Sequence, residues 1–212
     1  MSTLKFRVVP TTPIYTDAGS GAHLNVAIYE PQFPAEGGWY FLGHLALVNP
    51  LNKGYQDPSV EENAPDAILV QSDDPDALSP VKKLQQLWTD QHSHGDQNME
   101  IWSFQATKSG DYHPVGLFAS IVKKYGDDPT SQTSWSKLCA VRSDLLLPGN
   151  VGSMIWNDHG SHADGAGTWK NISLWHITGT GGILPTKTFL ASENYEDPPT
   201  AVTPSAYLLR EE

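Results

Sequence analysis

The chain has one cysteine among its 212 residues, Cys139, so an internal disulfide is excluded. Cys139 lies within an apolar stretch, and we expect a buried, unreactive thiol rather than a nucleophile. No apolar run is long enough to cross a membrane, and the first residues lack the apolar segment of a signal peptide. We therefore expect a cytoplasmic protein, or one that is exported without a signal peptide.

Basic residues are also scarce, since 13 Lys and Arg oppose 24 Asp and Glu, which leaves a formal net charge of −11. The pairs Lys82–Lys83 and Lys123–Lys124 are isolated and form no basic patch. Phosphate backbones would be repelled by such a surface, so we expect no nucleic-acid partner. Contact with an anionic membrane remains possible only through apolar groups, because charge would oppose it.

Recognisable catalytic motifs are missing as well. The chain has no nucleophile elbow, zinc-protease helix, phosphate loop or dinucleotide fingerprint, and we predict no cofactor. Asp158, His159 and Ser161 are too close together on one turn to be identified as a triad without geometry. A non-enzymatic protein is favoured, although the many acidic residues leave two-carboxylate hydrolysis open.

Helical periodicity is almost absent, and residues 79–88 (S-P-V-K-K-L-Q-Q-L-W) are the best candidate for a short helix. Short apolar stretches are interrupted by many of the 18 glycines and 16 prolines. This pattern predicts an all-β protein. The segments 50–66, 123–135 and 193–204 are rich in proline and acidic residues, and we expect them to be surface loops.

Three stretches of the sequence are versions of one another: Y-T-D-A-G-S from Tyr15, W-T-D-Q-H-S from Trp88 and W-N-D-H-G-S from Trp156. Each precedes an apolar run that ends in a second aromatic residue, and these are Tyr29, Trp102 and Trp175. The second aromatics are evenly spaced, because 102 − 29 and 175 − 102 both equal 73. A repeat of this length predicts three copies of one supersecondary unit that share a core.

We therefore expect one domain over 1–212, with repeats at about 10–73, 84–144 and 152–212. The first repeat starts after an apolar strand at 4–9, and the last ends with the C-terminal strand. This offset predicts that the N- and C-terminal strands pair in one sheet, which would remove an exposed edge.

The aromatic pairs are expected to fill the shared core. Trp39, Trp135 and Trp169 fall outside the repeat pattern. We expect them to be partly exposed in turns or loops, where an indole often marks a contact surface.

The repeated D-x-G-S turns admit two compatible interpretations. In the structural one, each Asp accepts backbone N–H groups and Gly permits left-handed φ. In the functional one, carboxylate, hydroxyl and indole groups together hold a sugar, which needs polar partners and an aromatic face. The candidate ligand-binding residues are Asp17, Ser20, His23, Asp90, Ser93, His94, Asp158, His159, Ser161, His162 and Trp169.

Histidines are concentrated in these turns, and His92-x-His94 and His159-x-x-His162 have the composition of a divalent-metal site. The first copy carries only His23, however, and three equal metal sites would require partners there too. We predict exposed polar loop residues and no metal site.

Three segments resemble the vacuolar protein sorting-associated (number sixty-two) family: I-W-N-D-H-G-S at 155–161, Y-H-P-V-G-L-F-A at 112–119 and L-C-A-V-R-S-D at 138–144. The resemblance spans most of the chain and is best from about 112 to 162. The first copy departs from it, with Gln71 in the place of Arg142 and Arg210. The resemblance implies a β-prism, in which three four-stranded Greek-key sheets surround a pseudo-threefold axis. β-Prisms include sugar-binding lectins and targeting domains of pore-forming toxins.

Three functions follow as hypotheses. The first is a non-enzymatic, lectin-like module that binds a glycan or another small polar ligand through turns gathered at one end. The second is a membrane- or partner-targeting module of a pore-forming or sorting system. The third is a small-molecule enzyme with a pocket near Asp158, His159 and His162.

Overall fold

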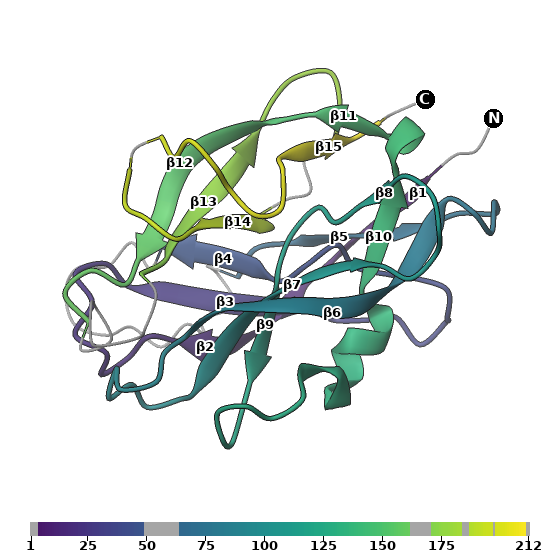
Figure 1. Ribbon diagram of the computed structural model, residues 1–212. Coiled ribbons are helices and arrows are strands. Elements are labelled where there is room, and N and C mark those ends of the chain that lie inside the picture. The colour runs from purple at the N-terminus through teal and green to yellow at the C-terminus, as the bar shows by residue number, and fades with distance from the viewer. Residues whose placement is uncertain (1–3, 49–63, 162–170, 184–186, 197, 211–212) are drawn as a thin grey trace.

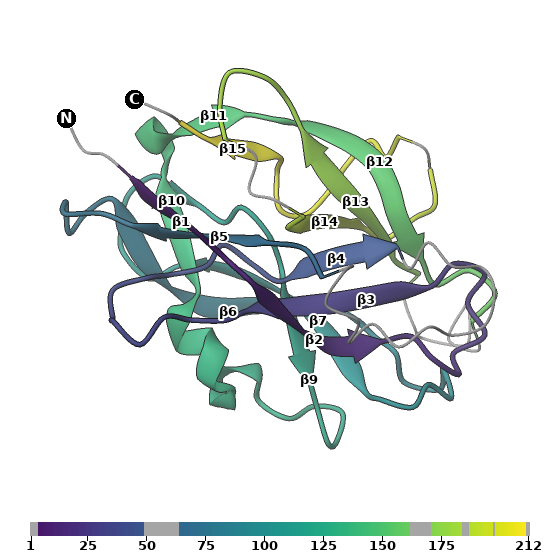
Figure 2. The ribbon, with the colours of Figure 1, turned by 180° about the vertical axis from the view of Figure 1, so that it is seen from behind.

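The computed structural model describes residues 4–48, 64–161, 171–183, 187–196 and 198–210. These residues form strands and short 3₁₀ helices, with no α-helix among them, so the prediction of an all-β protein is confirmed (Figures 1 and 2). The strands make several antiparallel sheets, none of which closes into a barrel. No helix in the described part is both long and apolar enough to span a bilayer.

The strands fall into three consecutive units. Unit 1 contains β1 (Lys5–Val9), β2 (Thr11–Thr16), β3 (Val26–Pro31), β4 (Leu45–Val48) and β5 (Ala67–Gln71). Unit 2 contains β6 (Leu78–Thr89), β7 (Met99–Ala106), β8 (Tyr112–His113), β9 (Phe118–Ile121), η2 (Pro129–Ser131), η3 (Thr133–Lys137) and β10 (Cys139–Arg142). Unit 3 contains η4 (Ser143–Leu145), β11 (Leu146–Pro148), β12 (Asn150–Asn157), β13 (Ser173–Thr178), β14 (Phe189–Ser192) and β15 (Tyr207–Leu209).

All three units share one strand order. The last strand of each unit returns to pair with the first, as β5 does with β1, β10 with β6 and β15 with β11. The opening strand then continues into a hairpin whose second strand pairs with a third. This order is that of a Greek key. The opening strand is continuous only in unit 2, because Pro10 and Gly149 interrupt it in units 1 and 3.

The prediction that the N- and C-terminal strands pair in one sheet is wrong. β1 pairs with β5 from Lys5↔Gln71 to Val9↔Ala67, and β15 pairs with β11. Each unit therefore closes on itself, and the repeats begin one strand earlier than the D-x-G-S motif indicates. The opening strands of units 2 and 3 share only L-x-P, at 78–80 and 146–148, and β1 lacks it. The D-x-G-S motif therefore did not reveal that these strands belong to the units that follow them.

Residues 79–88 form most of strand β6 and not the predicted short helix. β6 pairs with β7 through two register shifts, between Lys83 and Gln85 and between Gln86 and Trp88. A β-bulge inserts an extra residue and so breaks the alternation of apolar and polar side chains. The broken alternation explains why the segment did not look like a strand.

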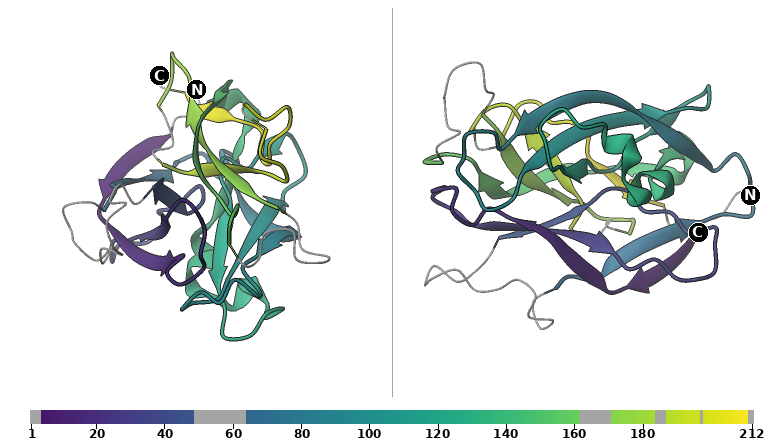
Figure 3. Two further views of the ribbon diagram at one scale, coloured as in Figure 1. Left: turned by 90° about the vertical axis from the view of Figure 1, so that its left-hand side faces the viewer. Right: turned by 90° about the horizontal axis from the view of Figure 1, so that it is seen from below.

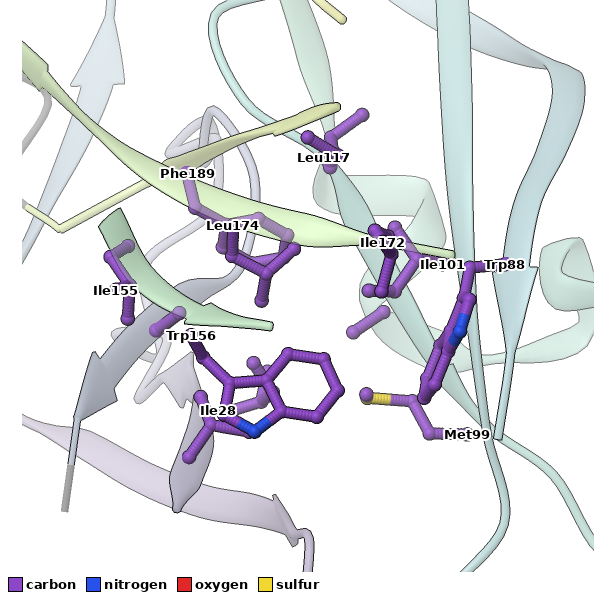
Figure 4. Packing of buried hydrophobic residues seen from close by; sticks show 14 of the residues in the cluster. Ile28, Trp88, Met99, Ile101, Leu117, Ile155, Trp156, Ile172, Leu174 and Phe189 are labelled. Atoms are coloured by element: carbon purple, nitrogen blue, oxygen red, sulfur yellow. The ribbon is translucent and has the colours of Figure 1, made fainter. Parts of the chain in front are cut away.

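The interior is shared by the three units, which surround it when the molecule is viewed from one end (Figure 3, left). Its central cluster includes Tyr15 of unit 1, Trp88 of unit 2 and Trp156 of unit 3. The two indoles meet edge to face, with ring centroids 5.7 Å apart (Figure 4). The first aromatic residue of each repeat therefore fills the common core, as predicted.

The second aromatic residues lie elsewhere. Tyr29 and Trp175 are buried in two separate apolar clusters. Trp102 is only partly buried, and the Lys83 ammonium lies 5.7 Å from its ring centroid. The prediction that these rings fill the same shared core is therefore wrong, because alternation along a strand turns the second ring to the other face of the sheet.

Of the three non-repeated tryptophans, Trp135 differs from expectation, whereas Trp39 is partly exposed as expected. Trp135 is 8% exposed and packs edge-on against Phe118, so its predicted exposure is wrong. Trp39 is half-buried, with the Arg7 guanidinium 5.9 Å from its ring, and Trp169 lies outside the described residues. Cys139 is buried, as predicted, and burial raises the pKa of its thiol well above the usual value.

Candidate functional site

The three repeated turns meet at one end of the molecule, at the left of Figure 1. We name them turn 1 (17–25), turn 2 (90–98) and turn 3 (158–161). The Asp96 amide of turn 2 donates to the Ala18 carbonyl of turn 1 over 3.0 Å, and the His23 amide donates to the His159 carbonyl of turn 3 over 3.1 Å. The prediction that the matching corners share one end is confirmed.

A closed ring of three buried hydrogen bonds joins these turns. The Tyr15 hydroxyl of unit 1 donates to the Asp90 carboxylate of unit 2 over 3.2 Å. Trp88 Nε1 of unit 2 donates to Asp158 of unit 3 over 3.0 Å, and Trp156 Nε1 of unit 3 donates to Asp17 of unit 1 over 3.1 Å, which closes the ring. Each repeat therefore supplies both a donor and an acceptor, and the repeated aromatic and acidic residues act as one braced assembly.

The other carboxylate oxygen of each Asp closes its own turn. It accepts a hydrogen bond from the backbone amide at the far end of the turn. The donors are Val26 to Asp17 over 3.0 Å, Met99 to Asp90 over 2.8 Å and Ile172 to Asp158 over 3.1 Å. The carbonyl of each Asp accepts a further N–H from the Ser three residues on. These bonds are those of the structural interpretation.

Two further donors to these carboxylates come from the long loops. The hydroxyl of Tyr125 donates to Asp90 over 2.9 Å, and that of Tyr195 donates to Asp158. Neither tyrosine is among the residues predicted from the sequence. The signal was present, because a Y-x-D pattern recurs at Tyr55, Tyr125 and Tyr195, although Tyr55 lies outside the described residues.

The predicted ligand-binding residues divide into three sets. The buried ones are Asp17, Ser20, Asp90, Ser93, Asp158 and Ser161. The exposed ones are His23, His94 and His159, and those outside the described residues are His162 and Trp169. Burial of every Asp and Ser of the motif favours the structural interpretation for these side chains, so the surface available to a ligand is formed by the residues between them.

Turn 2 has histidine at a position where turns 1 and 3 have glycine. Its His92 has φ +71° at the position where turns 1 and 3 have Gly19 (φ +79°) and Gly160 (φ +82°). The turn thus demands a left-handed residue, which costs histidine more than glycine. His94 also has positive φ, at +60°, where turn 1 has Gly21. Turn 2 therefore presents two exposed imidazoles at positions that favour glycine.

No group of three or more His, Cys, Asp or Glu side chains is placed to hold a metal ion within the described ranges. A cavity of about 330 Å³ lies between β6 and β14. It is lined by residues such as Leu87, Ala191 and Thr203 and by none of the turn histidines.

Burial raises the pKa of Asp17 and that of Asp90 to about 6, although their hydrogen bonds act in the opposite direction. The folded protein therefore binds protons more tightly at these groups than the unfolded chain does, where a carboxyl has a pKa of about 3.9. The stability that comes from protonation is present at low pH and is lost as the pH rises through 6.

We accordingly expect the free energy of unfolding to be higher at about pH 5 than at about pH 7.5, by about 1 to 3 kcal/mol for the two groups together. Urea unfolding at both pH values measures this difference. Because protonation also reduces the net negative charge, the comparison is repeated in about 0.5 M NaCl, which screens that contribution. Stability that rises steadily from pH 5 to 7.5 would contradict the prediction.

Strand order and turn geometry together define an all-β protein built from three Greek-key units with braced turns at one end. No family model and no curated protein matches the chain. The fold is similar to the crystal structure of GNIP1Aa from Chromobacterium piscinae, with a TM-score of 0.70 and 20% sequence identity. The similarity covers 98% of this chain and 37% of GNIP1Aa, so this chain spans little more than a third of that protein's length. At this identity the similarity concerns the fold alone.

Proposed function

We propose that the chain is a non-enzymatic binding module that recognises carbohydrate through the exposed parts of turns 1 to 3. The observation that carries the proposal is the closed ring of aromatic-to-carboxylate hydrogen bonds. It holds three loops from distant parts of the chain against one another, so that their exposed side chains stand on a rigid base. A preformed site loses less entropy when it binds.

The chemistry of the exposed side chains supports a sugar ligand. The imidazoles of His23, His94 and His159 can each donate or accept a hydrogen bond. The ring of Tyr195, half-buried, meets that of His159 edge to face with centroids 5.6 Å apart. Sugar binding needs such directional polar groups beside an aromatic surface. The net charge of −11 favours a neutral or cationic ligand over an anionic one.

The proposal includes a finer description of the fold. We propose that the three Greek-key units form a β-prism about a pseudo-threefold axis that passes through the ring of hydrogen bonds. Three similar sites at one end would then allow weak sugar contacts to combine on a multivalent surface. Membership of the vacuolar protein sorting-associated (number sixty-two) family stays a prediction.

The test is a glycan array followed by calorimetry with the sugars that bind. His94→Asn and His159→Asn are expected to weaken binding about 10-fold or more, as contact residues do. His113→Asn is the matched control, because His113 lies in β8 and so outside the three turns; its binding should equal that of the wild type. Absence of binding on the array and in calorimetry at about millimolar sugar would count against the proposal. An equal loss of sugar affinity in His113→Asn would do the same.

A second candidate is a membrane- or partner-targeting module, such as one in a pore-forming or sorting system. The observation that favours it is the coverage of the structural similarity, because a fold that fills 37% of a longer chain can serve as one part of a larger protein. Liposome flotation distinguishes the two candidates. Flotation that persists at high salt would indicate apolar attachment, since the acidic surface opposes electrostatic binding.

The enzyme hypothesis has less support from the geometry. Asp158 is fully buried, and its carboxylate accepts hydrogen bonds from Trp88, Ile172 and Tyr195. A general acid or base must reach the substrate, and His162, its proposed partner, lies outside the described residues.

A further inference from the structure

Two histidines from distant units meet on the surface of the turns. Nδ1 of His23 in turn 1 lies 3.2 Å from Nδ1 of His159 in turn 3. The ring centroids are 5.0 Å apart, with the planes inclined by 46°. Both residues are exposed, although they are 136 residues apart in the chain.

The backbone holds this pair in place. The His23 amide donates to the His159 carbonyl over 3.1 Å, and the His159 amide donates to the Asn157 side chain over 3.2 Å. The His23 ring packs closely against Gly160, because a Cβ atom at Gly160 would lie 2.4 Å from Nε2 of His23. Tyr195 packs against the opposite ring, that of His159. The two imidazoles are thus positioned before any ligand arrives.

The separation of the two nitrogens matches the geometry of metal coordination. Zinc–nitrogen bonds are about 2.0–2.1 Å long, so two nitrogens on a tetrahedral zinc ion lie roughly 3.3 Å apart. The observed separation of 3.2 Å is close to this value. Without a metal, one ring must carry its proton on Nδ1 to donate to the other. On metal binding this proton moves to Nε2 of the same ring, so that two neutral imidazoles bind the ion through Nδ1 with no net loss of protons.

We propose that His23 and His159 form a binding site for Cu²⁺ or Zn²⁺ that joins units 1 and 3. Two imidazoles occupy two coordination positions, and water or a ligand oxygen fills the others. Imidazole pairs favour Cu²⁺ over Zn²⁺ and bind both far better than Mg²⁺ or Ca²⁺, which prefer oxygen ligands. The pairing of His23 with His159 was not evident from sequence, because the two residues lie in different repeats and the histidine pattern grouped His159 with His162.

The experiment is a calorimetric titration of the full chain with CuCl₂ and ZnCl₂, with MgCl₂ and CaCl₂ as probes of non-specific cation binding. His23→Asn and His159→Asn each remove one proposed ligand. The double variant His92→Asn/His94→Asn is the matched control, because it removes two exposed histidines of the neighbouring turn 2, and asparagine tolerates their positive φ. Circular dichroism verifies that each variant is folded.

The wild type is expected to bind one Cu²⁺ ion and to show nitrogen coupling from two imidazoles in its paramagnetic resonance spectrum. Each single variant should lose about 10-fold or more in affinity, whereas the control should keep wild-type affinity. Because the ion would join two units, Cu²⁺ should also raise the melting temperature of the wild type and not that of His23→Asn. Equal Cu²⁺ affinity in wild type, His23→Asn and His159→Asn, or loss of affinity in the control alone, would overturn the proposal.

Discussion

Replacement of Asp90 by alanine is expected to lower the free energy of unfolding by about 3 to 5 kcal/mol. The carboxylate accepts hydrogen bonds from the Met99 amide, the Tyr15 hydroxyl and the Tyr125 hydroxyl, and Asp90 is 0% exposed. Alanine would leave the Met99 amide and the Tyr15 hydroxyl without this acceptor, whereas Tyr125 could still donate to Asn98 Oδ1 over 2.9 Å. An unpaired buried donor costs much more than a hydrogen bond contributes. For a chain of this length, the melting temperature should fall by about 6 °C or more.

Two variants make this measurement specific. Asp96→Ala changes an exposed acid of the same turn and should alter stability by about 0.5 kcal/mol or less. Asp90→Asn keeps the shape and one acceptor oxygen, so its stability should lie between those of wild type and Asp90→Ala. Thermal and urea unfolding measure all three. A melting temperature of Asp90→Ala close to that of the wild type would show that the ring of hydrogen bonds does not brace the fold.

Replacement of Gly43 by alanine should be nearly as damaging, with an expected loss of about 2 to 4 kcal/mol. Gly43 has φ +141°, and a Cβ atom there would lie 2.8 Å from the Leu117 amide nitrogen and 2.9 Å from the Leu117 carbonyl oxygen. These are backbone atoms of unit 2 and cannot rotate away. The neighbouring His44 also joins unit 1 to unit 2. Its amide donates to the Leu117 carbonyl and its Nδ1 accepts from the Ala119 amide, both over 2.9 Å.

Gly37→Ala provides the control for this prediction. Gly37 has no atom within 4 Å of the position that a Cβ would take, so alanine there should leave stability unchanged or raise it slightly. Urea unfolding of the two variants side by side measures the difference. If Gly43→Ala unfolds at the same urea concentration as Gly37→Ala, the close contact between units 1 and 2 is not a constraint on the fold.

Much of the architecture was readable from local patterns. The spacing of the D-x-G-S motifs predicted three related units, the gathering of the turns at one end and the burial of Tyr15, Trp88 and Trp156 in a shared core. These features repeat in the chain because each unit builds the same hairpin with the same turn. Segments that depart from regular alternation, such as residues 79–88 with their β-bulges, could not be assigned in this way.

The candidate site was predicted less completely. The motif identified the right loops but not the direction in which their side chains point. Whether Asp158 faces solvent or the interior depends on Trp88, which belongs to another unit and donates to it from 70 residues away. The exposed residues of the site are therefore those that the motif leaves variable, such as His23 and His159.

The amino-acid sequence by itself determined the local structure: the β-class, the threefold repetition and the turns with their left-handed positions. These depend on neighbouring residues and on the regular alternation of apolar side chains. The tertiary structure alone decided that β1 pairs with β5, that the three carboxylates are buried and that His23 meets His159. Those contacts join residues 58 to 139 positions apart, such as Val9 with Ala67 and Trp156 with Asp17. They exist only because packing of the three units brings them together.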